Sequence, residues 1–181
     1  MVESGLKIIL TGYRATGKST VGRLLARRLS IDFLDMDKEI EARAGTTIRE
    51  MVASHGWPYF REMERALLAE LAGRDRLVIA TGGGAVIHGE EWQRLKDTGL
   101  VVWLTADPAT IGLRLAGDHV TAAQRPSLTG SGTGREIESV LAQRTPLYQQ
   151  GSHLAVDTVG RTLEEIAALI LAALPQRTQV D

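Results

Sequence analysis

The sequence predicts an α/β fold of three layers, in which a parallel β-sheet lies between two layers of helices. Short apolar runs alternate along the chain with longer stretches whose apolar residues recur at helical spacing. This alternation is typical of a parallel sheet that is covered on both faces. The 181 residues suit one compact domain, and 44% of them are hydrophobic, which is enough for a buried core.

Five short apolar runs are predicted to form the strands. They cover residues 6–10, 33–34, 77–80, 100–104 and 154–156. A short apolar run that is bounded by turn residues is typical of a strand buried on both faces. Ligands of such sheets gather at the carboxyl ends of the strands, so functional residues are expected directly after these runs.

Helical spacing of apolar residues predicts the elements between the strands. In residues 18–29 the apolar positions are Val21, Leu24, Leu25 and Leu29. Further helices are predicted over residues 38–73 with breaks at Gly45 and around 56–58, about 90–97, from Pro108 onward, 135–148 and 163–174. Asp107 suits the N-cap of the helix that begins at Pro108, because proline fits the first helical position.

A long polar segment interrupts this pattern near the middle of the chain. Residues 117–134 are rich in glycine, serine and threonine and contain few core residues. They predict a long, mobile loop, and loops of this length are usually functional lids or disordered segments. The sequence shows no internal repeat and no linker that would divide it into two domains.

The composition argues against several classes of function. The formal net charge is −1 and the pI is about 6.4, so no basic field is available for nucleic acid. The absence of cysteine excludes disulfides and thiolate metal sites. The longest apolar stretch, residues 166–174, is shorter than the roughly 20 residues that span a bilayer. Residues 1–7 lack the pattern of a secretory signal. We therefore expect a cytoplasmic protein without membrane contacts.

A phosphate-binding motif follows the first predicted strand. Residues 12–19 read Gly-Tyr-Arg-Ala-Thr-Gly-Lys-Ser and fit the pattern G-x-x-x-x-G-K-[ST]. Its glycines let backbone N–H groups point at a phosphate, and the following helix adds the positive end of its dipole. Lys18 would reach the β- and γ-phosphates, and the Ser19 hydroxyl would ligate Mg²⁺. An ordinary glycine-containing turn is the alternative, but the strand before and the helix after favour a nucleoside triphosphate site.

Two aspartates, Asp35 and Asp37, stand where the second strand ends. One could cap the next helix while the other is merely solvated. Beside a phosphate loop, however, a carboxylate can hold the metal, often through water. A second carboxylate can orient or deprotonate an acceptor hydroxyl.

Three consecutive glycines, Gly82, Gly83 and Gly84, follow the third strand after Thr81. Many phosphate-loop proteins carry a metal-binding aspartate at this position, and its absence fits a metal role for Asp35. Without side chains, the glycines would let a small ligand lie against backbone N–H groups. A flexible strand-to-helix turn explains them equally well.

Three arginines are candidates for anion binding. Arg61 begins a helical stretch in which Glu64, three residues on, could hold its guanidinium group on the same face. Arg125 lies in the long loop, where a cation could close over transferring phosphates. Arg144 lies near the end of the next helix. A pair of arginines facing glycine N–H groups would suit a carboxylate, because a planar guanidinium binds it bidentately. Spacing alone does not assign these roles.

The histidines and tryptophans carry no comparable signal. The histidines show no metal-ligand spacing, and surface or loop positions are expected for all four: His55, His88, His119 and His153. The tryptophans are expected to pack in the core rather than to stack on bases, since aromatic residues make up 4% of the chain.

Taken together, the motifs resemble those of the shikimate kinase family over about residues 6–174. The resemblance includes the phosphate loop and adjacent threonine at 12–20, Asp-Met-Asp at 35–37, Phe-Arg-Glu-Met-Glu at 60–64, Thr-Gly-Gly-Gly-Ala at 81–85, Gln-Arg-Pro-Ser-Leu-Thr-Gly at 124–130 and Gln-Arg-Thr-Pro-Leu-Tyr at 143–148. Their combination in this order is far more specific than the phosphate loop alone.

The resemblance implies a phosphate-loop fold like that of nucleoside monophosphate kinases, with a five-stranded parallel sheet, a substrate-binding helical insertion and a lid. Residues 1–181 would form a single domain with its core at 1–34, 74–115 and 133–175, the insertion at about 35–73 and the lid at about 116–132. The implied activity is ATP- and Mg²⁺-dependent phosphorylation of the 3-hydroxyl of shikimate in aromatic amino-acid biosynthesis. A monomer is the default expectation.

The resemblance also implies an acceptor site and a metal site. Asp37 matches the residue that holds the shikimate hydroxyls and serves as base. Ser19 and Asp35 match the magnesium positions, with Asp35 acting through water. The other implied substrate contacts are Arg61, Gly82, Gly83, Gly84 and Arg144.

The implied ATP site spans the phosphate loop and three arginines. Lys18 and Arg125 match residues that act on the transferring phosphate, Arg125 from the lid. Arg114 matches a residue that stacks on adenine, and Arg161 matches another at the adenine site. The remaining implied contacts are Ala15, Thr16, Gly17, Ser19 and Thr20.

Two departures from the family pattern concern the edges of the site. Leu163 stands where some members place a proline against adenine, and residues 118–123 lack the basic cluster that some members carry in the lid.

A gluconate kinase of the same architecture is the nearest rival, since gluconate also carries a carboxylate and hydroxyls. The triple glycine and the helix around Arg61 argue against it. A catalytically silent nucleotide-binding module is the other alternative, but it would need no acceptor site.

Overall fold

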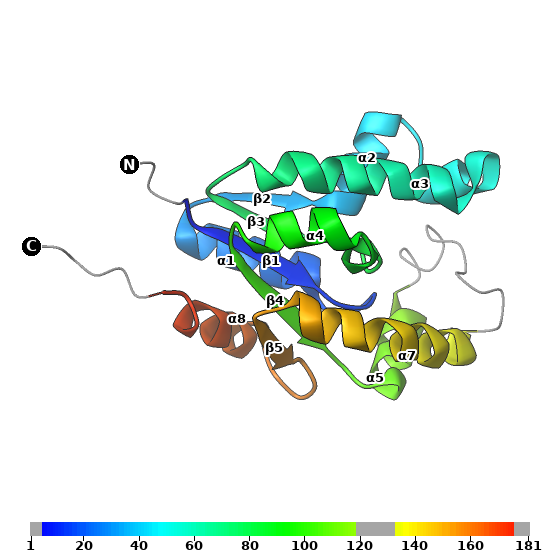
Figure 1. Ribbon diagram of the computed structural model, residues 1–181. Helices are drawn as coiled ribbons and strands as arrows, with labels where there is room; N and C mark the ends of the chain where they lie inside the picture. Colours follow the sequence, from blue (N-terminus) through cyan, green and yellow to red (C-terminus); the bar gives the residue numbers. More distant parts are fainter. Residues whose placement is uncertain (1–4, 119–132, 176–181) are drawn as a thin grey trace, which may run out of the picture.

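The computed structural model describes residues 5–118 and 133–175 (Figure 1). Within these ranges, one parallel sheet contains five strands in the order β2-β3-β1-β4-β5. The strands are β1 (Lys7–Thr11), β2 (Asp32–Asp35), β3 (Leu77–Ala80), β4 (Leu100–Thr105) and β5 (Leu154–Asp157). The predicted fold class is confirmed, and each predicted strand is found with its ends shifted by at most one residue.

Helices cover both faces of the sheet. The elements between and after the strands are α1 (Lys18–Leu29), α2 (Met36–Ala44), α3 (Ile48–Ala72), the 3₁₀ turn η1 (Ala85–Ile87), α4 (Gly89–Lys96), α5 (Pro108–Gly117), α7 (Thr133–Gly151) and α8 (Leu163–Ala172). Ile8 and Leu10 of β1 pack on the side of α1 and α8, whereas Ile9 packs on the side of α3 and α4. Because the strand has core on both sides, its apolar residues do not alternate with polar ones.

Local signals set the helix ends. The predicted N-cap is present at Asp107, whose Oδ1 accepts a hydrogen bond from the Thr110 amide at 2.8 Å. Thr47 and Glu50 form a capping box at the start of α3. Gly56, with φ of 80°, kinks the same helix where a break is predicted. The helix α7 continues through Pro146 to Gly151, so the predicted end at residue 148 is three residues too early.

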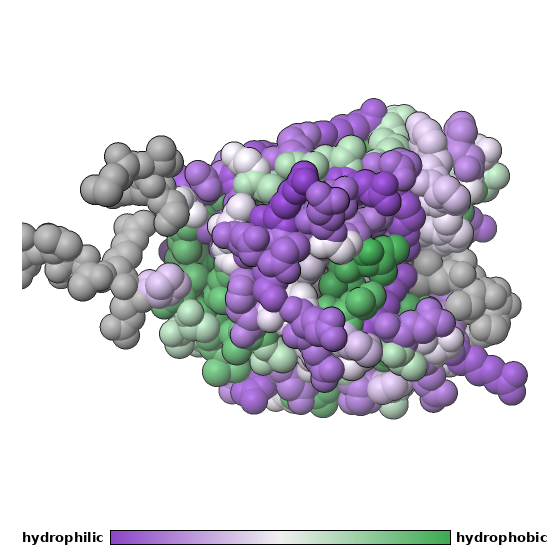
Figure 2. Space-filling view, in the orientation of Figure 1, coloured by the Kyte–Doolittle hydropathy of each residue, from purple (hydrophilic) through white to green (hydrophobic). Residues whose placement is uncertain are grey.

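The surface of the face formed by α3, α4 and α7 is mostly polar. Figure 2 shows hydrophilic side chains over most of this face, with hydrophobic ones gathered between α4 and α7. In the described residues, no helix is long and apolar enough to cross a membrane. Most of the predicted lid at 116–132, including Arg125, lies outside the described residues.

A buried lysine links the amino end of the central strand to the carboxyl end of α3. The Lys7 side chain, on a residue that is 2% exposed, donates to the carbonyls of Leu71 and Ala72 at 3.0 and 3.1 Å and to Thr98 Oγ1 at 2.8 Å. Burial lowers the pKa of Lys7, so the ammonium group carries a desolvation cost that these hydrogen bonds offset. A cation at a helix carboxyl end is also favoured by the helix dipole.

We expect Lys7→Met to lower the free energy of unfolding by about 1–3 kcal/mol, because buried carbonyl oxygens lose a charged donor. Urea denaturation followed by circular dichroism measures this change. Lys96→Met is the matched control: Lys96 also donates to a carbonyl, that of Gln150 at 2.7 Å, but at the surface. Water can replace that donor, so the control should change stability by less than about 0.5 kcal/mol. Equal effects of the two substitutions would contradict a special role for Lys7.

Candidate active site

The predicted site residues gather at the carboxyl ends of β1, β2 and β3. The loop after β1 carries the phosphate-binding motif, β2 ends at Asp35, and the three glycines follow β3. Since β3 lies between β2 and β1 in the sheet, these three loops lie next to one another. A ligand crevice at this edge is the general expectation for open parallel sheets.

The phosphate loop has the backbone shape that its glycines permit. Gly12 has φ of 138° and Gly17, at the N-cap of α1, has φ of 91°. A Cβ at Gly12 would collide with the Leu104 carbonyl oxygen. Lys18 folds back over the loop and donates to the carbonyls of Gly12 and Tyr13, each at 2.8 Å. The loop therefore brings the lysine ammonium to the mouth of the site.

A cavity of about 320 Å³ lies over this loop. Its lining includes Ala15, Gly17, Lys18, Ser19, Thr20, Asp35 and Asp37. Thr16 turns away from it: its residue is 2% exposed and its Oγ1 donates to the Tyr13 carbonyl at 2.8 Å. Most of the predicted phosphate-binding residues thus share one cavity, while Thr16 stabilises the loop from within.

Asp35 has the capping role considered for it from the sequence, and its second carboxylate oxygen faces the phosphate loop. Its Oδ1 accepts the amides of Asp37 and Lys38 at 3.1 and 3.3 Å, which caps α2. Its Oδ2 accepts a hydrogen bond from the Ser19 hydroxyl. Because capping uses one carboxylate oxygen, the other remains directed at the phosphate loop.

The Ser19 and Asp35 oxygens fit the requirements of a magnesium ion. Mg²⁺ prefers oxygen donors and usually keeps several waters and substrate phosphates as ligands. In the described residues, no group of three or more histidines, aspartates or glutamates could hold a metal by itself. A metal here would therefore depend on the phosphates of a nucleotide, which is the pattern expected beside a phosphate loop.

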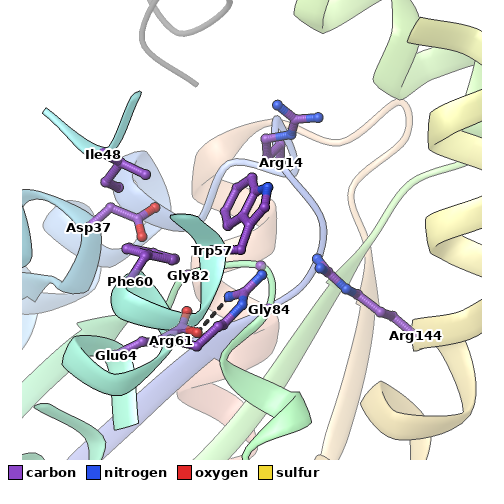
Figure 3. A pocket seen from close by; sticks show the side chains of 11 residues that line it. Arg14, Asp37, Ile48, Trp57, Phe60, Arg61, Glu64, Gly82, Gly84 and Arg144 are labelled. Atoms are coloured by element: carbon purple, nitrogen blue, oxygen red, sulfur yellow. Dashed lines mark hydrogen bonds and ion pairs between the residues drawn. The ribbon is translucent and has the colours of Figure 1, made fainter. Parts of the chain in front are cut away.

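A second pocket lies beside the first, between α3 and α7 (Figure 3). Arg61, Trp57, Phe60 and Glu64 reach it from α3, and Arg144 reaches it from α7. Gly82, Gly83 and Gly84 line it from the loop after β3. The structure thus brings together the two arginines and three glycines that the sequence proposes for an acceptor.

Arg61 is held tightly in this pocket. Its Nη1 forms an ion pair with Glu64 Oε2 at 2.6 Å (Figure 3), and its Cζ lies 5.4 Å from the ring centroid of Trp57. A Cβ added at Gly84 would lie 2.7 Å from Arg61 Cζ. A side chain at position 84 would therefore displace the guanidinium, which lies directly against the backbone.

Arg144 and Tyr148 connect α7 to the glycine segment. A Cβ at Gly83 would lie 3.7 Å from Arg144 Nη1. The Tyr148 hydroxyl donates to the Gly83 carbonyl at 2.5 Å, and burial raises the pKa of Tyr148 to about 12. The phenol therefore stays protonated at neutral pH and holds the Gly83 peptide in one orientation.

Asp37 lies at the junction of the two cavities. Together with Arg14 and Ile48, it lines both the cavity over the phosphate loop and the arginine pocket. Asp37 is 8% exposed, and its Oδ1 would lie 3.0 Å from a Cβ at Gly82. A carboxylate in this position can contact molecules bound on either side.

A third cavity, of about 250 Å³, adjoins the phosphate loop on the side of α5 and α8. It is lined by Arg114, Arg161 and Leu163, together with loop residues such as Gly17. Arg114 Nη1 donates to Thr158 Oγ1 at 2.9 Å and to the Ala15 carbonyl at 3.2 Å. The two arginines proposed for the adenine end therefore lie together, with Leu163 beside them.

Sequence reasoning missed several residues of the site. Arg14 occupies an unconstrained position of the phosphate motif, yet its Nη2 pairs with Glu136 of α7 at 2.8 Å, and it lines both the cavity over the phosphate loop and the arginine pocket. Trp57 lines the arginine pocket as well as packing against the core. A surface or loop position was expected for His88: it lies in the loop between η1 and α4, but it is buried there, with 5% of the residue exposed. No sequence pattern marks the contacts of Arg14 and His88, since each joins elements that are distant along the chain, whereas Trp57 stands four residues before Arg61 on α3, a spacing that could have indicated its position.

The fold and the site define the class of this protein as a phosphate-loop kinase. The family model described as shikimate kinase matches residues 14–175. The chain belongs to the shikimate kinase family.

Individual relatives agree with this assignment. A shikimate kinase of Rhodopirellula baltica is 42% identical over 93% of this chain and 90% of its own length. A shikimate kinase of Syntrophus aciditrophicus is 44% identical over 91% and 88% of the two chains. The solved structure of a shikimate kinase from Acinetobacter baumannii in complex with shikimate is 35% identical, with a TM-score of 0.85, and the match covers 93% and 92% of the two chains.

The rival considered from the sequence shares the fold more distantly. A gluconokinase structure from Sinorhizobium meliloti matches with a TM-score of 0.54 and 18% identity, over 93% of this chain and 90% of that one. A likeness at this level of identity concerns the fold alone.

Proposed function

We propose that this chain transfers the γ-phosphoryl group of ATP to the 3-hydroxyl of shikimate, giving shikimate 3-phosphate and ADP. The reaction is a step in the biosynthesis of chorismate and the aromatic amino acids. The observation that carries the proposal is the position of Asp37, which lines both the phosphate-loop cavity and the pocket of two arginines. Family membership and the shikimate complex of the Acinetobacter baumannii relative support the choice of acceptor.

In this proposal the two arginines hold the acceptor by its carboxylate. Arg61 and Arg144 line one pocket, and planar guanidinium groups bind carboxylates bidentately. The three glycines provide a surface without side chains against which the ring can lie. The pairing of Arg61 with Glu64 at 2.6 Å supports this role, because it orients the guanidinium before substrate arrives.

Asp37 then acts on the hydroxyl that receives the phosphate. Its carboxylate accepts the proton of the 3-hydroxyl, and the hydroxyl oxygen forms a bond to the γ-phosphorus. The bond from that phosphorus to the β–γ bridging oxygen breaks, and ADP leaves. General-base groups of this kind contribute roughly 10²- to 10⁴-fold to a rate.

The donor side is proposed to follow from the phosphate loop. Lys18 and the loop amides bind the β- and γ-phosphates, and Arg125, which lies outside the described residues, closes over them from the lid. Arg114 and Arg161 contact the adenine end. Ser19 and, through water, Asp35 would hold Mg²⁺, which would neutralise charge on the phosphates. All these residues belong to one chain, so the proposed enzyme is a monomer, and we propose that it acts in the cytoplasm.

A coupled assay that offers shikimate, gluconate and nucleoside monophosphates in turn tests the proposed function. ADP release should require ATP and Mg²⁺, and of the three kinds of acceptor only shikimate should give rapid release. Turnover of gluconate but not of shikimate would refute the choice of acceptor. Failure with every acceptor, despite ATP binding, would favour a silent nucleotide-binding module.

A further inference from the structure

His88 lies at a position that the proposed chemistry does not use. His88 lies between η1 and α4, at the N-cap position of α4, and its side chain is 3% exposed. Its Nε2 lies 2.9 Å from Oε2 of Glu64, a residue of α3 whose side chain is 1% exposed. A buried polar side chain of this kind normally serves a specific hydrogen bond, because burying it without a partner is costly.

The partner of His88 is the carboxylate that also holds Arg61. Glu64 Oε2 receives both Arg61 Nη1 at 2.6 Å and His88 Nε2 at 2.9 Å. A carboxylate in an ion pair accepts hydrogen bonds and does not donate, so His88 Nε2 carries the proton in this contact. Two donors from different elements thus converge on one oxygen.

The other carboxylate oxygen of Glu64 is confined by the glycine segment. Oε1 is buried and has no hydrogen-bond partner in the part of the chain that the structure describes. It would lie 2.6 Å from a Cβ at Gly82. Rotation of the carboxylate is therefore restricted on one side by backbone and on the other by the two donors.

We propose that His88 is a positioning residue for the acceptor pocket, which holds Glu64 so that Glu64 in turn orients the Arg61 guanidinium. This inference rests on the proposed function, in which Arg61 binds the carboxylate of shikimate. The segment from Gly84 to His88 then contacts Arg61 twice, directly at Gly84 and through Glu64 at its other end. Without the donor on His88, the carboxylate would keep one partner instead of two, and the guanidinium would lose its fixed orientation.

The test compares two substitutions of His88. His88→Phe keeps a ring of similar size but removes the donor, whereas His88→Gln keeps an N–H group that can reach Glu64. We expect His88→Phe to raise the KM for shikimate about tenfold, as removal of a hydrogen bond to a charged group does. The KM for ATP and kcat should stay within about twofold, because the lost interaction concerns acceptor binding. His88→Gln should restore the KM for shikimate to within about threefold of the wild type.

Binding can be measured without turnover. Trp57 lines the same pocket, so shikimate titration followed by tryptophan fluorescence gives a Kd for each variant, and that Kd should rise together with the KM. His55→Phe is the matched control, since His55 is an exposed histidine on α3 that stacks on Tyr59 outside the pocket. It should leave both constants unchanged.

A double-substitution cycle tests whether His88 acts through Glu64. In a Glu64→Gln background, His88→Phe should have no further effect on the KM for shikimate. Additive effects would overturn the proposal, as would an unchanged KM in His88→Phe or equal losses in the Phe and Gln variants. Thermal unfolding shows whether each variant folds. If His88→Phe does not fold, His88→Leu is used in its place. If neither variant folds while His88→Gln does, His88 serves the stability of the fold and the positioning role is overturned.

The failure of this inference can be told apart from failure of the proposed function. Absence of shikimate phosphorylation by the wild-type chain would refute the function itself. Normal turnover by the wild type, with unaltered shikimate binding in His88→Phe, would refute the positioning role alone.

Discussion

Asp37→Asn is expected to lower kcat for shikimate phosphorylation by roughly 10²-fold or more while leaving ATP affinity nearly unchanged. The amide has almost the same shape as the carboxylate but cannot accept the proton of the acceptor hydroxyl. Asp37 lines the cavity on the phosphate side as well as the arginine pocket, so the substitution alters the junction without altering the phosphate loop. Steady-state kinetics with each substrate varied in turn, together with a nucleotide-binding titration, measure both parts of the prediction.

Asp32→Asn is the control for this substitution. Asp32 begins β2, the strand that leads to the helix carrying Asp37, and it is exposed at the end of β2 opposite to the site. Its kinetic constants should equal those of the wild type. A kcat for Asp37→Asn within a few fold of the wild type would remove Asp37 from the proton transfer and leave it, at most, as a contact to the substrate.

Arg61→Lys is expected to raise the KM for shikimate by roughly 10- to 100-fold, because an ammonium group cannot reproduce the bidentate contact of a guanidinium with a carboxylate. The charge is retained, so the substitution tests geometry rather than attraction. Lysine would also lose the fit of a planar group against Gly84 and near the Trp57 and Phe60 rings. The KM for ATP should change little, since Arg61 lines the acceptor pocket and not the cavity over the phosphate loop.

Arg65→Lys offers a matched control one helical turn further along α3. Arg65 is half-exposed and pairs with Glu62 at 3.3 Å at the surface. The same change there should leave every kinetic constant within about twofold of the wild type, as expected for an exposed ion pair. An unaltered KM for shikimate in Arg61→Lys would argue against a carboxylate contact at that residue.

Much of the fold could be predicted because its signals are local. The five strands are short apolar runs that end at turn residues, and the helices between them have apolar residues at helical spacing. The predicted end of α7 was three residues too early, and contacts between distant parts of the chain explain why. The helix α7 runs through Pro146 because residues after the proline pack against other elements: Tyr148 is fully buried and stacks on Trp103 of β4, and the Gly151 carbonyl accepts a hydrogen bond from Trp92 of α4. These contacts outweigh the local tendency of proline to end a helix.

The residues of the site were predictable for a similar reason, whereas its contacts between different helices and loops were not. The motifs identify residues at strand ends, and the strand ends of a parallel sheet share one edge. The pairing of Arg61 with Glu64 follows from a spacing of three residues on one helix. Nothing in the spacing places Arg144 of α7 in the same pocket as Arg61 of α3, because these residues are brought together by two helices packed on one face of the sheet.

The sequence by itself determined the three-layer fold, the phosphate loop at Gly12 to Ser19 and the residue types of an acceptor site. These follow from periodicity and from short motifs, which depend on neighbours within a few positions. Tertiary structure decided that Asp37 stands between two cavities, that Arg14 joins the phosphate loop to α7, and that His88 is buried against Glu64. The physical reason is that burial and hydrogen-bond partners depend on which elements pack together. A single histidine or arginine carries no local pattern that would reveal them.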